Sequence, residues 1–237
     1  MRRWSWCLFL MLSAGLSSGV QASPVVSFES GLQLPIESRV QVFRQNASKG
    51  FVFLSKTAFD SGESLTTRWR ALTTMGRLNA QAFRKEIDRA LKSPEWFMRN
   101  AALIALLSDE RDRAVEQSMR LLGDPALIVR TQAVRNLIAL NANEAEAKLW
   151  AEIHNRRNFK GRESLWIRAH LAEALSRLAR PGQAKAFQAL LLEEDWRLHP
   201  WAIRGLEKST GWKLGAANES TEVRRQQWLA RLGVQEL

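Results

Sequence analysis

A helical segment recurs along this chain at intervals of about 31 residues, and this recurrence constrains the fold more than any other feature. Its clearest copy begins at Asp124-Pro125 and carries Arg130, with Ala133 three residues later and Leu137 seven residues later. Apolar residues at this spacing share one face of a helix. We call Arg130 and its equivalents the marker residues: Arg68, Arg99, Arg130, Arg168 and His199. Repetition at a fixed period predicts a stack of similar units.

Each unit is predicted to contain two helices. The helices that carry the marker residues, the marker helices, are expected at 64–78, 94–107, 124–140, 163–179 and 195–208. Companion helices are expected between them, at 80–92, 110–122, 143–154 and 183–193. Asp124 is predicted to cap its helix, with Pro125 at the first helical position. We therefore expect an all-α fold, a right-handed α-α superhelix of about five two-helix repeats.

The first residues have the composition of a secretory signal. A basic start is followed by the apolar stretch Trp4–Leu16 and by the small residues of Val20-Gln21-Ala22. We predict a signal peptide over 1–22, cut before Ser23, with an uncleaved N-terminal anchor as the alternative. Cys7 is the only cysteine, so the mature chain could form neither disulfides nor thiolate metal sites. The predicted location is the periplasm or the extracellular space.

The two ends of the mature chain are predicted to cap the repeats, since a terminal repeat would otherwise expose its apolar side. Residues 23–49 are expected to be an extended lead-in and a capping helix that opens at Pro35. The repeat domain is predicted over 50–208, beginning with a buried helix near 49–59, for which a strand is the alternative. Residues 209–237 are expected to form a C-terminal cap around a helix at 222–232, with Val223, Gln227 and Trp228 near the core side.

The repeat resembles the HEAT repeat. The resemblance is carried by Asp124-Pro125 and Val129-Arg130 with the following Ala and Leu, and it covers roughly residues 50–208. Weaker copies carry Thr67-Arg68, Met98-Arg99 and Ile167-Arg168, whereas the last has Leu198-His199 before Pro200. The resemblance implies an α-solenoid in which each marker arginine pairs with an Asp at a neighbouring joint, as Asp124 could, with ligand binding by these arginines as the alternative. The implied structural ladder comprises Arg68, Arg99, Asp124, Arg130 and Arg168. The C-terminal region also looks like the ends of exported bacterial HEAT-repeat proteins.

Two enzyme-linked groups share this repeat type. Deoxyhypusine hydroxylases carry His-Glu pairs, but the histidines here are followed by other residues, in His154-Asn155, His170-Leu171 and His199-Pro200. The DNA alkylation repair glycosylases use a basic concave face with tryptophan and a carboxylate, and no motif here singles out a catalytic acid. We therefore expect no enzymatic activity, no metal site and no cofactor.

The formal net charge is +11, and arginines greatly outnumber lysines. Arginine suits the recognition of carboxylates and phosphates, although a biased composition explains the same excess. Positions two, five and nine residues after each marker lie opposite the core. We call the candidate binding residues there the basic strip: Arg70, Arg77, Arg135, Arg177, Trp201, Arg204 and Lys208. The alternative is an ordinary solvated face. Trp201 is predicted to be exposed, and Trp96, Trp166 and Trp196 to lie in the core.

One interval is seven residues longer than the others, and the additional residues fall near 154–162. Insertions in solenoids enter loops, often on the working face. This one contributes four further candidate binding residues: Arg156, Arg157, Lys160 and Arg162. Because lengthening a loop costs little, about 0.6 kcal/mol per doubling, we expect a mobile, partner-facing loop that stability does not require.

The leading functional prediction is an exported, non-enzymatic interaction or scaffold module. Its basic concave face would bind an acidic protein or an anionic envelope polymer, and no transmembrane segment is expected in the mature chain. One alternative is a nucleic-acid-binding protein related to the DNA alkylation repair glycosylases, although a secretory signal makes nucleic acid unlikely as a partner. Another alternative is a structural subunit of an envelope assembly.

Overall fold

The computed structural model describes residues 26–216 and 218–233, and helices make up most of them, which confirms the all-α prediction. The predicted signal peptide, residues 1–22, lies outside this part. The helices are α1 Phe28–Gln33, α2 Ile36–Gln45, α3 Ala47–Ala58, α4 Leu65–Asn79, α5 Arg84–Leu91, α6 Trp96–Leu106, α7 Arg111–Leu121, α8 Leu127–Ala139, α9 Glu146–Ile153, α10 Ile167–Leu178, α11 Ala184–Leu192, α12 His199–Thr210 and α13 Thr221–Arg231. Two 3-10 helices, η1 Asn143–Ala145 and η2 Arg156–Asn158, and two strands, β1 Phe159–Lys160 and β2 Glu163–Ser164, complete the list for the described residues. No helix among these residues has the length and apolar character needed to cross a membrane.

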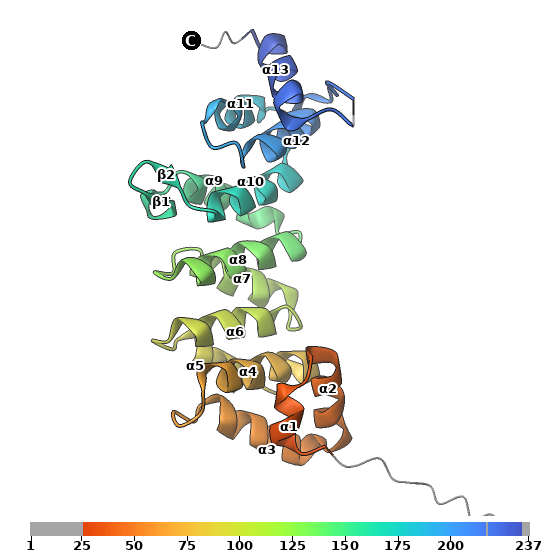
Figure 1. Ribbon diagram of the computed structural model, residues 1–237, viewed down its shortest axis with the longest axis vertical. Helices are drawn as coiled ribbons and strands as arrows, with labels where there is room; N and C mark the ends of the chain where they lie inside the picture. Colours follow the sequence, from red (N-terminus) through yellow and green to blue (C-terminus); the bar gives the residue numbers. More distant parts are fainter. Residues whose placement is uncertain (1–25, 217, 234–237) are drawn as a thin grey trace, which may run out of the picture.

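The helices are stacked along the long axis of the molecule, from α1–α3 at one end to α13 at the other (Figure 1). The marker helices are α4, α6, α8, α10 and α12, and each packs against the next one. The companion helices α3, α5, α7, α9 and α11 each pack against the marker helix that follows them. The core lies between these two rows. It includes the buried residues four positions after each marker, namely Leu72, Leu103, Val134, Ala172 and Ile203.

Several helix ends differ from the sequence prediction. Helix α8 begins at Leu127 rather than at Asp124, so Pro125 is not its first helical residue. Asp124 instead lies in the joint, where one carboxylate oxygen accepts from the Ala126 amide at 2.8 Å and both accept from Arg99. The lead-in is not fully extended either. Helix α1 forms within it because the Ser27 hydroxyl caps its first turn and Leu32 is buried.

The predicted burial of Trp96, Trp166 and Trp196 and the predicted exposure of Trp201 are wrong, whereas Trp228 is buried as predicted. Trp96 is 45% exposed and Trp196 is 72% exposed, while Trp166 is also exposed and Trp201 is half-buried. Trp96 is the first residue of α6, while Trp166 and Trp196 lie just before α10 and α12. Their side chains therefore lie at the joints rather than between the two rows. In the C-terminal helix Val223 is likewise exposed, whereas Trp228 is fully buried.

Candidate binding face

Three of the four marker arginines, Arg68, Arg99 and Arg168, are each paired with an acid. Both outer nitrogens of Arg68 donate to Glu95, at 2.8 and 2.5 Å, and Arg99 makes two bonds to Asp124, at 2.6 and 2.8 Å. Arg168 makes two bonds to Glu193, at 2.6 and 2.7 Å. Such bidentate contacts are among the stronger hydrogen bonds in proteins. In each case the acid lies in the joint before the next marker helix, so these arginines brace successive units and are not free to bind a ligand.

Arg130 has no acid as its main partner, and the insertion supplies a neutral one. Its Nε donates to Asn158 Oδ1 at 3.1 Å, and an outer nitrogen donates to the Arg157 carbonyl oxygen at 3.0 Å. The other outer nitrogen donates to the carbonyl oxygens of Asp124 and Pro125. Burial, together with the positive charge of Arg157, lowers the pKa of Arg130 below its ordinary value. The guanidinium is therefore held in place mainly by backbone and amide oxygens.

The prediction of a mobile insertion is wrong, because the insertion folds onto the stack. Asn158 is fully buried, and the Arg168 guanidinium lies 4.3 Å from the centre of the Phe159 ring. Arg157 donates to the Gly123 carbonyl oxygen at 2.8 Å. A sequence signal for the turn exists at Gly161, whose positive φ of 64° fits the tight loop between β1 and β2.

The insertion and the basic strip do not form one patch. Arg156, Arg157, Lys160 and Arg162 are exposed, but they belong to η2 and the hairpin. Helix η2 contacts the joint before α8, and the hairpin covers Arg168 near the start of α10. Arg135 and Arg177 lie in the C-terminal halves of these helices. The structure therefore separates the two predicted groups of cations along the helix axes.

Most of the basic strip is exposed and continuous across three helices. Arg77, Arg135, Arg177, Arg204 and Lys208 are exposed, whereas Arg70 is half-buried and donates to Gln33. Lys208 Nζ on α12 donates to the Arg177 carbonyl oxygen on α10 at 2.5 Å. Arg135 on α8 is close enough to His170 on α10 to affect its pKa. These two contacts join α8, α10 and α12 into one basic surface.

The cations of the strip differ in their partners. Arg77 pairs with Glu37 at 3.2 Å and Arg177 with Glu173 at 2.8 Å, and all of these side chains except Glu173 are well exposed. Exposed pairs of this kind contribute little stability, so a competing carboxylate can replace them. Arg135 and Arg204 form no ion pair with any residue in the described part of the chain.

At its N-terminal end the same face is hollowed and apolar, a feature that the sequence pattern does not indicate. A hollow of about 440 Å³ opens where α2 lies beside α4 and α6. Its lining consists of Ile36, Arg39, Trp69, Thr73, Arg77, Ile104, Leu107 and Ser108. The hollow cannot be predicted from the repeat period, because the period does not give the position of α2 relative to the repeats.

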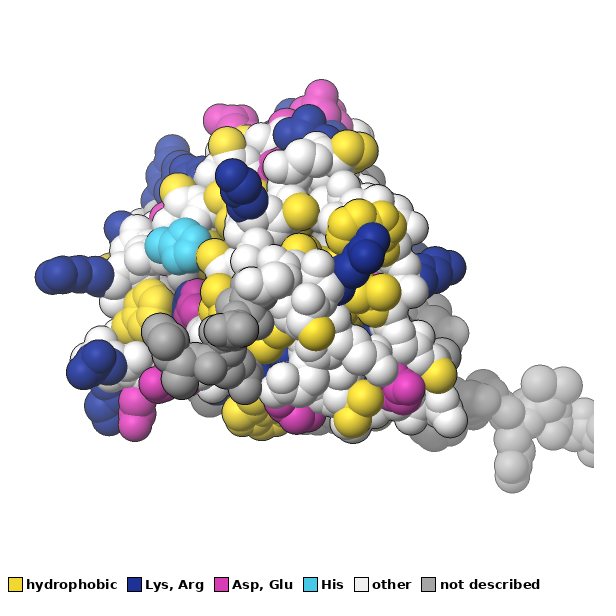
Figure 2. Space-filling view, turned by 90° about the horizontal axis from the view of Figure 1, so that it is seen from above, with side chains coloured by type: hydrophobic (Ala, Val, Ile, Leu, Met, Phe, Trp, Pro, Cys, Tyr) yellow, Lys and Arg dark blue, Asp and Glu magenta, His cyan; other side chains and the backbone are white. Residues whose placement is uncertain are grey.

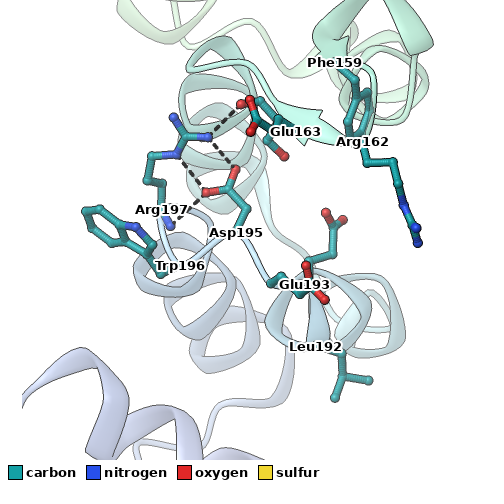
Figure 3. A pocket seen from close by; sticks show the side chains of 10 residues that line it. Phe159, Arg162, Glu163, Leu192, Glu193, Asp195, Trp196 and Arg197 are labelled. Atoms are coloured by element: carbon teal, nitrogen blue, oxygen red, sulfur yellow. Dashed lines mark hydrogen bonds and ion pairs between the residues drawn. The ribbon is translucent and has the colours of Figure 1, made fainter.

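A larger open hollow of about 1050 Å³ separates the β1–β2 hairpin from the joint before α12 (Figure 3). Two of its four acids are engaged: Glu193 pairs with Arg168, and Asp195 pairs with Arg197 at 2.8 Å. Arg197 also donates to the Ser164 carbonyl oxygen at 2.8 Å. No group of three potential metal ligands occurs among the described residues. The charged groups of this hollow hold the joint and hairpin together.

No family model, no curated protein and no solved structure matches this chain. The fold and the site together define an all-helical protein with a basic strip and an apolar hollow on its marker helices.

Proposed function

We propose that this chain is an exported HEAT-like solenoid that binds an acidic segment of another protein on its basic strip and catalyses no reaction. The repetition of one marker helix and one companion helix supports the solenoid, as does the recurring arginine contact at the joints. In the last unit His199 replaces the arginine, and its Nε2 lies 2.8 Å from the Glu193 carbonyl oxygen.

The packing of the two rows supports a curved stack with the marker helices on the inner side. Successive marker helices pack closely, while successive companion helices make at most marginal contact within the described part of the chain. The close approach of α4 and α6 depends on Gly76, because a Cβ there would collide with the backbone of Ala105. A two-row stack bends toward its tighter row, and solenoids use the concave surface that results for binding.

The observation that carries the proposal is the contrast between inward and outward arginines. The inward arginines Arg68, Arg99 and Arg168 each have a carboxylate partner, whereas Arg135 and Arg204 on the strip have none in the described residues. Arg177 and Lys208 lie between or beside these two unpaired arginines on contacting helices. A row of exposed cations in which two arginines lack a carboxylate partner is complementary to an extended acidic segment.

An acidic protein is favoured over single-stranded nucleic acid because the strip lacks an exposed aromatic platform. Single-strand binding proteins stack bases on accessible aromatic side chains in a basic groove. The aromatic residue of the strip, Trp201, is half-buried, and the exposed Trp96, Trp166 and Trp196 lie at the joints. The predicted export also favours a protein partner over nucleic acid. If the chain is exported, mass spectrometry should show that the mature protein begins at Ser23.

The binding test uses fluorescence anisotropy with a labelled oligoglutamate peptide. A variant combining Arg135→Glu, Arg177→Glu and Arg204→Glu should weaken binding at least about tenfold, since attraction becomes repulsion. The matched control combines Arg120→Glu, Lys148→Glu and Lys185→Glu, three exposed cations on companion helices whose reversal changes net charge equally.

This control is needed because cations project on several sides of the molecule, as the view from the α13 end shows (Figure 2). If both variants lose affinity equally, overall charge governs binding and the strip has no special role. An oligonucleotide of similar charge that bound more tightly than the peptide would favour the nucleic-acid alternative instead.

A further inference from the structure

The hollow beside α2 is apolar because its polar side chains are already engaged within the chain. Arg39 donates to the carbonyl oxygens of Leu34 and Arg70, and the Thr73 hydroxyl donates to the Trp69 carbonyl oxygen. The Trp69 indole N–H donates to Asn100 at 3.2 Å. What these contacts leave for a ligand is mainly the surface of Ile36, Ile104, Leu107 and the Trp69 ring.

The hollow adjoins the basic strip on one side. Ser108 at its edge, two residues after the end of α6, occupies the repeat position that corresponds to Arg77 on α4 and Ala139 on α8. The nearest contacting marker helix, α8, carries the unpaired Arg135. The Arg77 guanidinium lines the hollow itself and is held only by an exposed pair with Glu37. An apolar cavity with a cation at its rim therefore leads directly into a row of cations.

We propose that this hollow binds one bulky apolar side chain of the acidic segment, whose acidic residues then cross α8, α10 and α12. The proposal rests on the proposed function and adds an anchor and a direction to it. The volume of about 440 Å³ lies within the range of small-ligand pockets and exceeds the needs of one aromatic ring. A carboxylate next to the apolar residue would take the place of Glu37 on Arg77.

The test compares two labelled oligoglutamate peptides by fluorescence anisotropy, one ending in 4-fluorophenylalanine and one ending in glycine. The aromatic peptide should bind the full-length wild-type chain about tenfold more tightly, as expected for burying one aromatic side chain. Leu107→Gln, which removes an apolar wall that is 40% exposed, should abolish this advantage and leave the glycine peptide unaffected. Leu192→Gln on α11 is the matched control, because Leu192 is a similarly exposed leucine on a companion helix.

Fluorine NMR of the aromatic peptide provides the second readout. Its resonance should shift on binding the wild type and the Leu192→Gln variant, but not on binding Leu107→Gln. If both peptides bind the wild type equally, the hollow is not an anchor, although the basic strip stands. If neither peptide binds, the proposed function and this inference both fall.

Discussion

At the scale of single residues, the arginines of this chain fall into two groups according to what they contact. The recurrence of the marker residue predicts which arginines share a face with the core, because helix periodicity is local information. It does not predict their acceptors. Glu95, Glu193 and Asn158 lie in joints of differing length, and only the folded joints bring them to Arg68, Arg168 and Arg130.

The burial of the acid should set the stability contribution of each arginine–acid pair. The Asp124 side chain is 3% exposed and accepts from both Arg99 and the Ala126 amide, whereas the Glu95 side chain is 39% exposed. Asp124→Ala should lower the free energy of unfolding in urea by about 3 kcal/mol or more. Glu95→Ala should lower it by about 1 kcal/mol or less. Equal losses would show that burial does not distinguish the two pairs.

His170 reports on the charge of the basic strip. Burial lowers its pKa below the ordinary value of about 6.5, Arg135 lowers it further, and Glu173 opposes both effects. Because the folded state binds the proton less well than the unfolded state, this group destabilises the fold as pH falls below about 6.5. An NMR titration should show that Arg135→Gln raises the pKa of His170. An unchanged pKa would mean that Arg135 does not face this helix.

At the scale of elements, the insertion shows how composition can mislead. Four basic residues in a lengthened joint indicate a solvated loop, and all four, Arg156, Arg157, Lys160 and Arg162, are indeed exposed. The same segment nevertheless contains Asn158, which bonds Arg130 and also donates to the Glu152 carbonyl oxygen at 2.8 Å. The buried amide of Asn158 determines that the segment packs against the stack. The average charge of the segment does not reveal this packing.

Asn158→Ala should therefore destabilise the protein although it lies within the insertion. It leaves the buried Arg130 Nε and the Glu152 carbonyl oxygen without these partners, at a cost of about 2–3 kcal/mol. Lys160→Ala, on the exposed side of the hairpin, should change the free energy of unfolding by no more than about 0.5 kcal/mol. Thermal and urea unfolding would reveal the difference. If Asn158→Ala left the free energy of unfolding unchanged, the insertion would be dispensable for stability, as the sequence predicted.

At the scale of the whole molecule, the repeat predicts the number and order of the helices better than it predicts the surface. The repeat does not predict the exposure of Trp96 and Trp196, because Trp96 lies at the first residue of α6 and Trp196 just before α12, at the joints rather than between the two rows. The apolar hollow depends on α2 packing against α4, a contact outside the repeat, so that residues of α2, α4 and α6 line it together. The basic strip follows from helix periodicity alone, whereas the lack of an acid partner for Arg135 and Arg204 among the described residues is visible only in the folded structure.

Zero-length cross-linking with a carbodiimide tests the central claim most directly, because it joins a carboxylate only to an amine in contact with it. Lys208 is the lysine of the basic strip, and Lys148 and Lys185 are exposed on companion helices. With an oligoglutamate peptide bound to the full-length chain, mass spectrometry should locate the new amide bond mainly at Lys208. Coupling spread evenly over Lys148, Lys185 and Lys208 would contradict a binding face on the marker helices.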